Sequence, residues 1–113
     1  MKALIAEDDF MGRLLLQNLL RPYAQTDVAV NGKEAVEAFR LALRNGEPYR
    51  LVCMDIMMPE MDGQEALKRI RQIERLSERS GPDEAKVIMT TALDDPKNVV
   101  EAYYKGGDRK SVV

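Results

Sequence analysis

The sequence has no histidine and one cysteine, Cys53, in 113 residues. Without histidine it lacks the commonest general base, the commonest zinc ligand and any Ser-His or Cys-His nucleophile pair. A single thiol forms neither an internal disulfide nor a cysteine metal site, and it fits a reducing compartment. These absences argue against most hydrolases and against zinc proteins.

An excess of positive charge is also missing. The chain has 17 basic and 19 acidic residues spread along its length, which give a net charge of -2. No basic stripe offers counterion release to nucleic acid. The apolar stretch at the N-terminus is too short for a signal peptide or a membrane span. We therefore expect a soluble, cytoplasmic protein with no nucleic-acid or membrane partner.

Short apolar runs alternate with segments of helical periodicity. A composition of 45% hydrophobic and 32% charged residues is typical of one globular domain, here residues 1–113. The apolar runs predict strands at 2–6, 26–30, 50–55 and 86–91. The helical spacings predict helices at 14–20, 34–43, 64–76 and 98–104. This alternation indicates an α/β fold, a doubly wound parallel sheet with helices on both faces.

Acidic residues stand where the predicted strands end. Glu7 and Asp8 follow the first strand, Asp55 ends the third and Thr91 ends the fourth. Ligands of open parallel sheets bind beyond the carboxyl ends of the strands, so these side chains should converge there. Crowded carboxylates need a cation, and oxygen ligands without histidine or thiolate favour Mg²⁺. For Asp9 the better interpretation is an ordinary solvated loop residue or a helix N-cap.

Three motifs carry a resemblance to a known family. The runs LIAEDD, MDIMMPEMDG and VIMTTA resemble the receiver domains of two-component response regulators. The second run is very specific, because it joins an apolar strand, an Asp, two Met, a Pro and an acidic Gly turn. The resemblance implies a flavodoxin-like sheet of strand order 2-1-3-4(-5).

The resemblance also implies roles for individual residues. Asp55 would accept a phosphoryl group, and with Asp8 and the backbone carbonyl of Met57 it would bind Mg²⁺, while Glu7 acts mainly through metal-bound water. Thr91 would hydrogen-bond a phosphoryl oxygen and move in the switch. The partners implied are a histidine kinase or phosphotransfer protein and an output protein that the sequence does not identify. Such a receiver is not a dedicated enzyme, although it catalyses its own phosphotransfer and dephosphorylation.

The chain departs from the family after its Gly pair, where receivers continue with a fifth strand, Lys-Pro and a fifth helix. We expect this strand and helix to be missing or altered, the domain to be C-terminally incomplete, and the fourth strand to be an unpaired edge. Leu14 and Val87 would then face water or a partner. Lys110 is better interpreted as a solvated tail residue than as a phosphate ligand. Three explanations of this departure stay open: the residues given stop short of the true terminus, the receiver is a shortened one, or two copies pair as a homodimer that covers the open sheet edge.

Two other functions stay open. The chain is a pseudo-receiver, an interaction module not regulated by phosphorylation, if the missing Lys disables the switch. It is a Mg²⁺-dependent phosphatase if the acidic cluster serves hydrolysis of other substrates. That class needs a second general acid, and the residue two positions after Asp55 is Met57.

Overall fold

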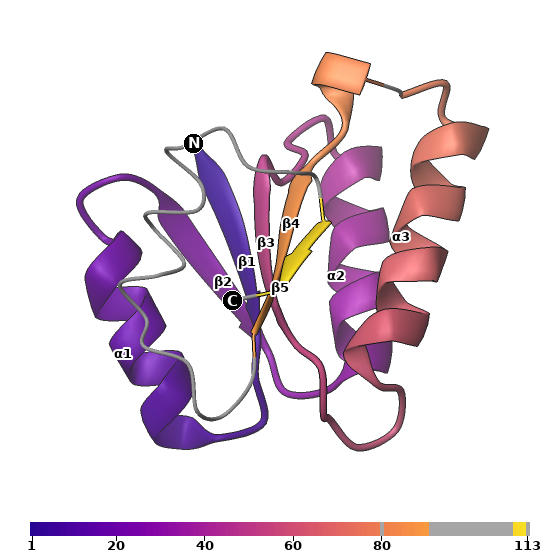
Figure 1. Cartoon of the computed structure of the whole chain (residues 1–113). Coiled ribbons are helices and arrows are strands. Elements are labelled where there is room, and N and C mark those ends of the chain that lie inside the picture. Colours follow the sequence, from indigo (N-terminus) through magenta and orange to yellow (C-terminus); the bar gives the residue numbers. More distant parts are fainter. Residues whose placement is uncertain (80, 91–109, 113) are drawn as a thin grey trace.

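A computed structural model describes residues 1–79, 81–90 and 110–112 of the chain (Figure 1). The strands are β1 Lys2–Ala6, β2 Gln25–Ala29, β3 Leu51–Asp55, β4 Lys86–Thr90 and β5 Lys110–Val112. The helices are α1 Phe10–Leu20, α2 Gly32–Arg44 and α3 Gly63–Leu76, with a short 3₁₀ helix, η1, at Gly81–Asp83. Within these residues, no helix has the length and apolar character needed to cross a membrane.

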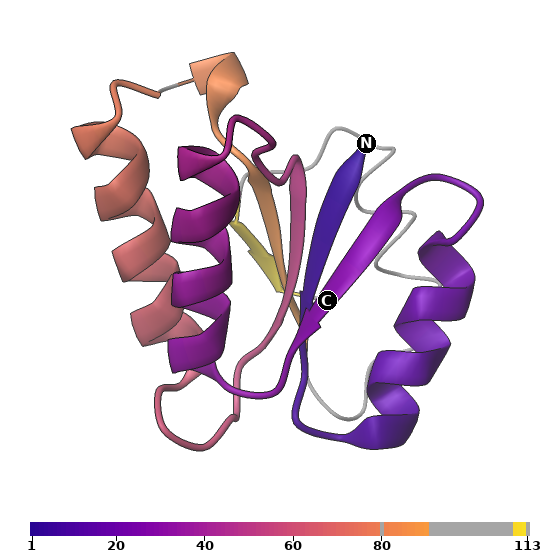
Figure 2. The same ribbon diagram turned by 180° about the vertical axis from the view of Figure 1, so that it is seen from behind.

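The strands form one parallel sheet in the order β2-β1-β3-β4-β5. Helix α1 covers one face, and α2 and α3 cover the other (Figures 1 and 2). The predicted fold class and the strand order 2-1-3-4 are confirmed. The helix predicted at 98–104 lies outside the residues that the structure describes.

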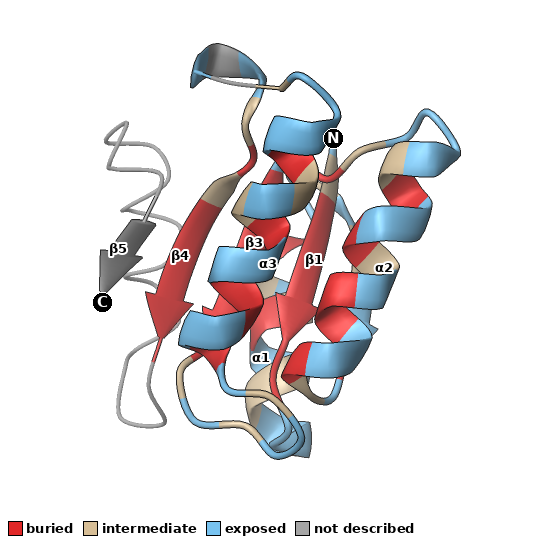
Figure 3. Cartoon of the chain, turned by 90° about the vertical axis from the view of Figure 1, so that its right-hand side faces the viewer, coloured by how far each residue is buried: buried red, intermediate tan, exposed pale blue. Residues whose placement is uncertain are grey.

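The core has two halves because side chains of a strand alternate between the faces of the sheet. Leu4, Val52 and Val87 point toward α2 and α3, whereas Ile5 and Cys53 point toward α1. Both faces of β3 are therefore covered, and all of its residues are buried (Figure 3). This burial explains why the sequence of β3 is continuously apolar up to its terminal acid.

One expectation about the open edge was wrong. Strand β5 pairs with β4 in parallel, in the register Val87 with Lys110, so β4 is not an unpaired edge. Val87 is fully buried rather than facing water. Leu14 on α1 is 37% exposed, in line with the expectation for that side chain. A short, altered fifth strand is thus present where the sequence analysis expected a missing or altered one.

The three α-helices begin with a side-chain cap at the same rim. The carboxylate of Asp9 accepts the Gly12 amide, Asn31 accepts that of Glu34, and Asp62 accepts that of Glu65. Each cap satisfies an amide that has no partner within its helix. The interpretation of Asp9 as an N-cap is confirmed. The first turns of α1, α2 and α3 thus lie beside the carboxyl ends of the strands, where the predicted site lies.

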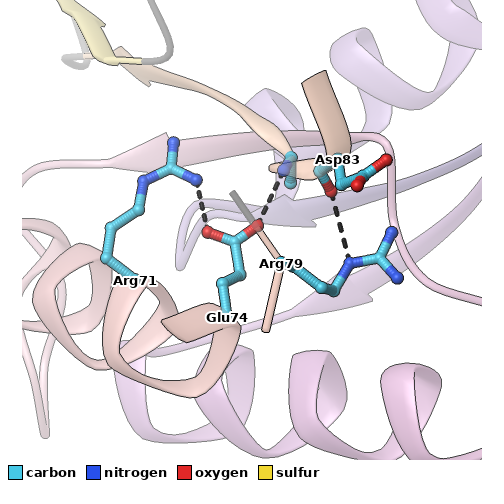
Figure 4. Close-up of polar contacts among 5 residues, drawn as sticks. Arg71, Glu74, Arg79 and Asp83 are labelled. Atoms are coloured by element: carbon cyan, nitrogen blue, oxygen red, sulfur yellow. Dashed lines mark hydrogen bonds and ion pairs between the residues drawn. The ribbon is translucent and has the colours of Figure 1, made fainter. Parts of the chain in front are cut away.

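A buried carboxylate joins the end of α3 to the start of β4 (Figure 4). The side chain of Glu74 is inaccessible, and one of its oxygens accepts the Ala85 amide at 2.7 Å. The other oxygen accepts the guanidinium of Arg71 from the same helix. Nearby, Arg79 Nε donates to the Asp83 carbonyl at 3.2 Å. These bonds set where β4 enters the sheet.

Candidate functional site

Three carboxylates converge where β1 and β3 end. One oxygen each of Glu7, Asp8 and Asp55 lies within 4.8 Å of the others. Glu7 and Asp55 are buried, while Asp8 is exposed. The two strands are neighbours in register, Ala6 beside Met54, so the residues that follow them meet at one edge. The structure therefore brings these carboxylates together as the sequence predicted.

The environment of Glu7 disfavours its charged form. Burial raises the pKa of the Glu7 carboxyl from 4.5 to about 8, and the neighbouring Asp55 carboxylate adds to the rise. The Asp9 amide donates to Glu7 Oε2 at 3.3 Å, which opposes the shift. Helix α1 approaches closely here, since a Cβ added at Gly12 would lie 3.1 Å from Glu7 Oε1. Without a cation, Glu7 thus keeps its proton up to about pH 8.

The backbone beneath the cluster is tied to α1 by Arg13. Its guanidinium donates to the carbonyl of Glu7 at 2.9 Å and to the carbonyl of Asp8 at 3.1 Å. Sequence reasoning missed this residue. The only available signal was a cation placed one helical turn after the Asp9 cap. Arg13 therefore fixes the backbone that carries both acids.

Asp55 is held by the loop that follows it. The Met57 amide donates to Asp55 Oδ1 at 3.2 Å, and the Ile56 amide donates to the Thr90 carbonyl at 3.0 Å. The helix after the loop packs directly on the backbone of Asp55. A Cβ at Gly63 would lie 2.2 Å from the Asp55 carbonyl oxygen, so this position requires glycine. The Asp55 carboxyl is therefore fixed by its own loop and by β4.

The remaining predicted residues are placed only in part. Met57 lies in the loop with its side chain 76% exposed. Strand β4 ends at Thr90, which is buried and in register with Asp55. Thr91 lies outside the described residues. The backbone of Lys110 is in register with Val87, well before Thr90 at the rim.

The donor set fits a hard divalent cation. Each of the three carboxylates offers an oxygen, and two of these groups are buried side by side. Mg²⁺ prefers oxygen ligands and keeps several waters, which the exposed side of Asp8 leaves room for. The pKa of Glu7 is raised chiefly by burial and further by the adjacent Asp55 carboxylate, and a bound cation would offset both effects.

The comparison with protein families shows which family the fold belongs to. The family model described as "Response regulator receiver domain" matches residues 3–110. This chain belongs to the response regulator receiver family. The receiver is 36% identical over 100 residues to two-component response regulator 24 of Arabidopsis thaliana, covering 82% of this chain and 69% of the relative. Other curated relatives are longer, since matches cover 52% of a rice regulator and 4% of a hybrid histidine kinase of Dictyostelium discoideum.

Two solved structures resemble the receiver along its length. One is the CheX-CheY-BeF3-Mg complex from Borrelia burgdorferi, with 29% identity and a TM-score of 0.66, covering 100% of this chain and 78% of that chain. The other pairs the histidine phosphotransfer protein Ypd1 of Saccharomyces cerevisiae with the receiver domain of Ssk1, with 26% identity and a TM-score of 0.67, covering 99% and 77%. The receiver thus has the fold of proteins known in complex with Mg²⁺ or with a phosphotransfer partner.

Proposed function

We propose that this receiver accepts a phosphoryl group on Asp55 from a histidine kinase or a phosphotransfer protein. The proposal rests on one observation above all, the convergence of the Glu7, Asp8 and Asp55 oxygens within 4.8 Å at the rim of the sheet. A cytoplasmic location and the absence of a nucleic-acid partner stay predictions from the sequence.

The chemistry follows from the placement of Asp55. Its carboxylate oxygen forms a bond to phosphorus while the phosphorus–nitrogen bond of a phosphohistidine breaks and its electron pair returns to the imidazole. Asp8, Asp55 and the Met57 carbonyl are the residues that would hold Mg²⁺, with Glu7 acting through bound water. When bound, Mg²⁺ screens the negative charge shared by the carboxylates and the incoming phosphoryl oxygens. The Met57 amide keeps Asp55 oriented during attack.

The surface around the site suits a protein donor. Phe10 and Met11 begin α1 directly after the acidic residues and are 64% and 57% exposed. Met57 is exposed on the loop on the other side of the cluster. Exposed apolar side chains beside a reactive group favour a macromolecular partner. The structural neighbour in complex with Ypd1 supports a phosphotransfer protein in this role.

The pseudo-receiver is the second candidate, and the register of β5 favours it. The backbone of Lys110 lies opposite Val87 rather than at the level of Asp55 and Thr90. A lysine ligand for the phosphoryl group is therefore not placed at the rim by β5. In this alternative the same face binds a partner without phosphorylation.

The experiment that separates the two is phosphorylation by a small donor. The purified chain is incubated with Mg²⁺ and acetyl phosphate, and its intact mass is measured. We expect a gain of one phosphoryl group in the wild-type chain and none in Asp55→Asn. Asp62→Asn is the matched control, because it makes the same change in the same loop on the α3 cap, and it should still gain the group.

Two outcomes would contradict the proposal. No mass gain in the wild-type chain, with Mg²⁺ bound, would favour the pseudo-receiver. A gain that persists in Asp55→Asn would place the phosphoryl group on another residue.

A further inference from the structure

The start of α2 is in unusually close contact with the loop between β3 and α3. The Gly32 amide donates to the Met61 carbonyl at 3.1 Å. A Cβ built at Gly32 would lie 2.1 Å from that carbonyl oxygen and 2.8 Å from its carbon. Both partners are backbone, so a side chain at this position would require the helix or the loop to shift.

The loop that Gly32 contacts is the one that carries the predicted metal ligand. It leaves β3 at Asp55, includes Met57, and reaches α3 after Met61. Its other backbone hydrogen bonds to the flanking elements lie at its two ends, where the Ile56 amide donates to the Thr90 carbonyl and the Gly63 amide donates to the Ile56 carbonyl at 2.9 Å. The side chains of Met58 and Met61 also pack against the core on the α2 and α3 side of the sheet. The contact with Gly32 is therefore the backbone hydrogen bond that ties the α3 side of the loop to α2.

We infer that Gly32 is a positioning residue for the phosphoacceptor site, which acts through the Met61 carbonyl on the loop that presents Met57 to Mg²⁺. This inference rests on the proposed function, because it assigns a role in that same site. Gly32 touches neither Asp55 nor the acidic cluster directly in any contact described. Its role is to let α2 approach the loop closely enough to define where Met61 and the residues before it lie.

Local helix propensity makes the opposite prediction. Gly32 is the first residue of α2, after the Asn31 cap, and its backbone conformation does not require glycine through a positive φ. Alanine is the better helix former, so Gly32→Ala would stabilise an isolated helix. A loss of function in that variant would come from the contact with Met61, not from the helix.

The test compares Gly32→Ala with the wild-type chain in two measurements. In amide NMR spectra of the metal-free chains, we expect the signals of residues 55–62 to shift more than those in the middle of α2. In a Mg²⁺ titration of the same samples, we expect affinity to fall by about tenfold or more, as for residues that orient metal ligands indirectly. Acetyl phosphate labelling should recover at saturating Mg²⁺.

Two control variants separate positioning from stability. Lys33→Ala changes the exposed neighbour of Gly32 and should bind Mg²⁺ like the wild-type chain. Phe39→Leu removes buried volume from α2 about two turns later, where the ring packs against Tyr49 ahead of β3, so it lowers stability at the end of the sheet away from the loop. Wild-type Mg²⁺ affinity in Gly32→Ala, or an equal loss of affinity in Phe39→Leu, would overturn the inference.

The inference can fail separately from the proposed function. If the wild-type chain binds Mg²⁺ but takes no phosphoryl group, the proposed function fails and the effect of Gly32 on Mg²⁺ affinity still decides the inference. If Gly32→Ala does not fold, amide hydrogen exchange of the wild-type chain replaces it. Mg²⁺ should then slow exchange at Gly32 and leave Glu34, which is bonded to the Asn31 side chain, unchanged. Equal slowing at both amides, or none, would overturn the inference.

Discussion

Glu74 shows how a single buried charge supports the fold. Its carboxylate is inaccessible and satisfies both the Ala85 amide and the Arg71 guanidinium. Replacing it with alanine would remove the acceptor of a buried amide and the buried carboxylate that pairs with Arg71. We expect Glu74→Ala to lower the free energy of unfolding by about 3 kcal/mol or more, measured by urea denaturation.

Glu65 provides the matched control for this prediction. It also pairs with an arginine of α3, Arg69, at 3.2 Å, but both side chains are about half exposed. Glu65→Ala should therefore cost less than about 1 kcal/mol. Equal losses in the two variants would show that burial of the Glu74 pair does not matter.

Glu7 should make the stability of the metal-free chain depend on pH. Its pKa is about 8 in the folded state and 4.5 when unperturbed, so between these values the folded state holds a proton that the unfolded state has released. The stabilisation is complete below pH 4.5 and is lost as the pH rises through about 8. Glu7→Gln should flatten this part of the profile in denaturation at a series of pH values. If the free energy of unfolding depended on pH equally in both chains, Glu7 would not be the group responsible.

The same proton competes with Mg²⁺. Raising the pH toward 8 removes it, so Mg²⁺ affinity should increase over this range in the wild-type chain and change less in Glu7→Gln.

At the scale of elements, the N-cap of α2 shows how much capping contributes to stability. Asn31 Oδ1 accepts the Glu34 amide at 2.7 Å, and Glu34 in turn accepts the Val30 amide at 3.2 Å. Asn31→Ala should destabilise the chain by about 1 kcal/mol, measured by thermal or urea unfolding. Asn31→Asp keeps an acceptor at the cap and should cost much less. A large loss in both would point to a role of Asn31 beyond capping.

The ends of elements show what could be predicted from the sequence. The first strand was predicted at its observed bounds, because Glu7 and Asp8 interrupt the apolar run at the rim. The second helix begins earlier than the predicted start at residue 34, because Asn31 caps the helix and Gly32 is its first residue. The close contact with Met61 explains why glycine stands at this position. Such a contact between segments distant in the sequence cannot be predicted from local patterns.

The convergence of the acids was also predictable, unlike the bonds that hold them. Parallel strands place Glu7, Asp8 and Asp55 at one edge whatever the details of packing. Arg13 and Glu74 were not identified, because a charged residue within a helical pattern is by default solvated. Arg13 binds two backbone carbonyls, and Glu74 binds a backbone amide as well as the Arg71 side chain. Backbone groups occur at every position, so the sequence does not mark the ones that serve as partners.

For the whole molecule, Mg²⁺ should act as a stabiliser. A ligand that binds only the folded state adds about 2.7 kcal/mol when its concentration is a hundred times the dissociation constant. Thermal unfolding with excess Mg²⁺ and with a chelator should therefore differ in midpoint for the wild-type chain. Asp8→Asn should remove most of this difference, and an undiminished difference would place Mg²⁺ elsewhere.

Chemical labelling of Cys53 can be used to measure how often the sheet opens. The thiol sits in β3 between Ile5 of β1 and Ile88 of β4, is 1% exposed, and burial raises its pKa to about 12. An aromatic disulfide reagent can reach this sulfur only after neighbouring strands have separated. Because the chain has no second cysteine, the rate of thiol labelling reports opening of the central strands alone.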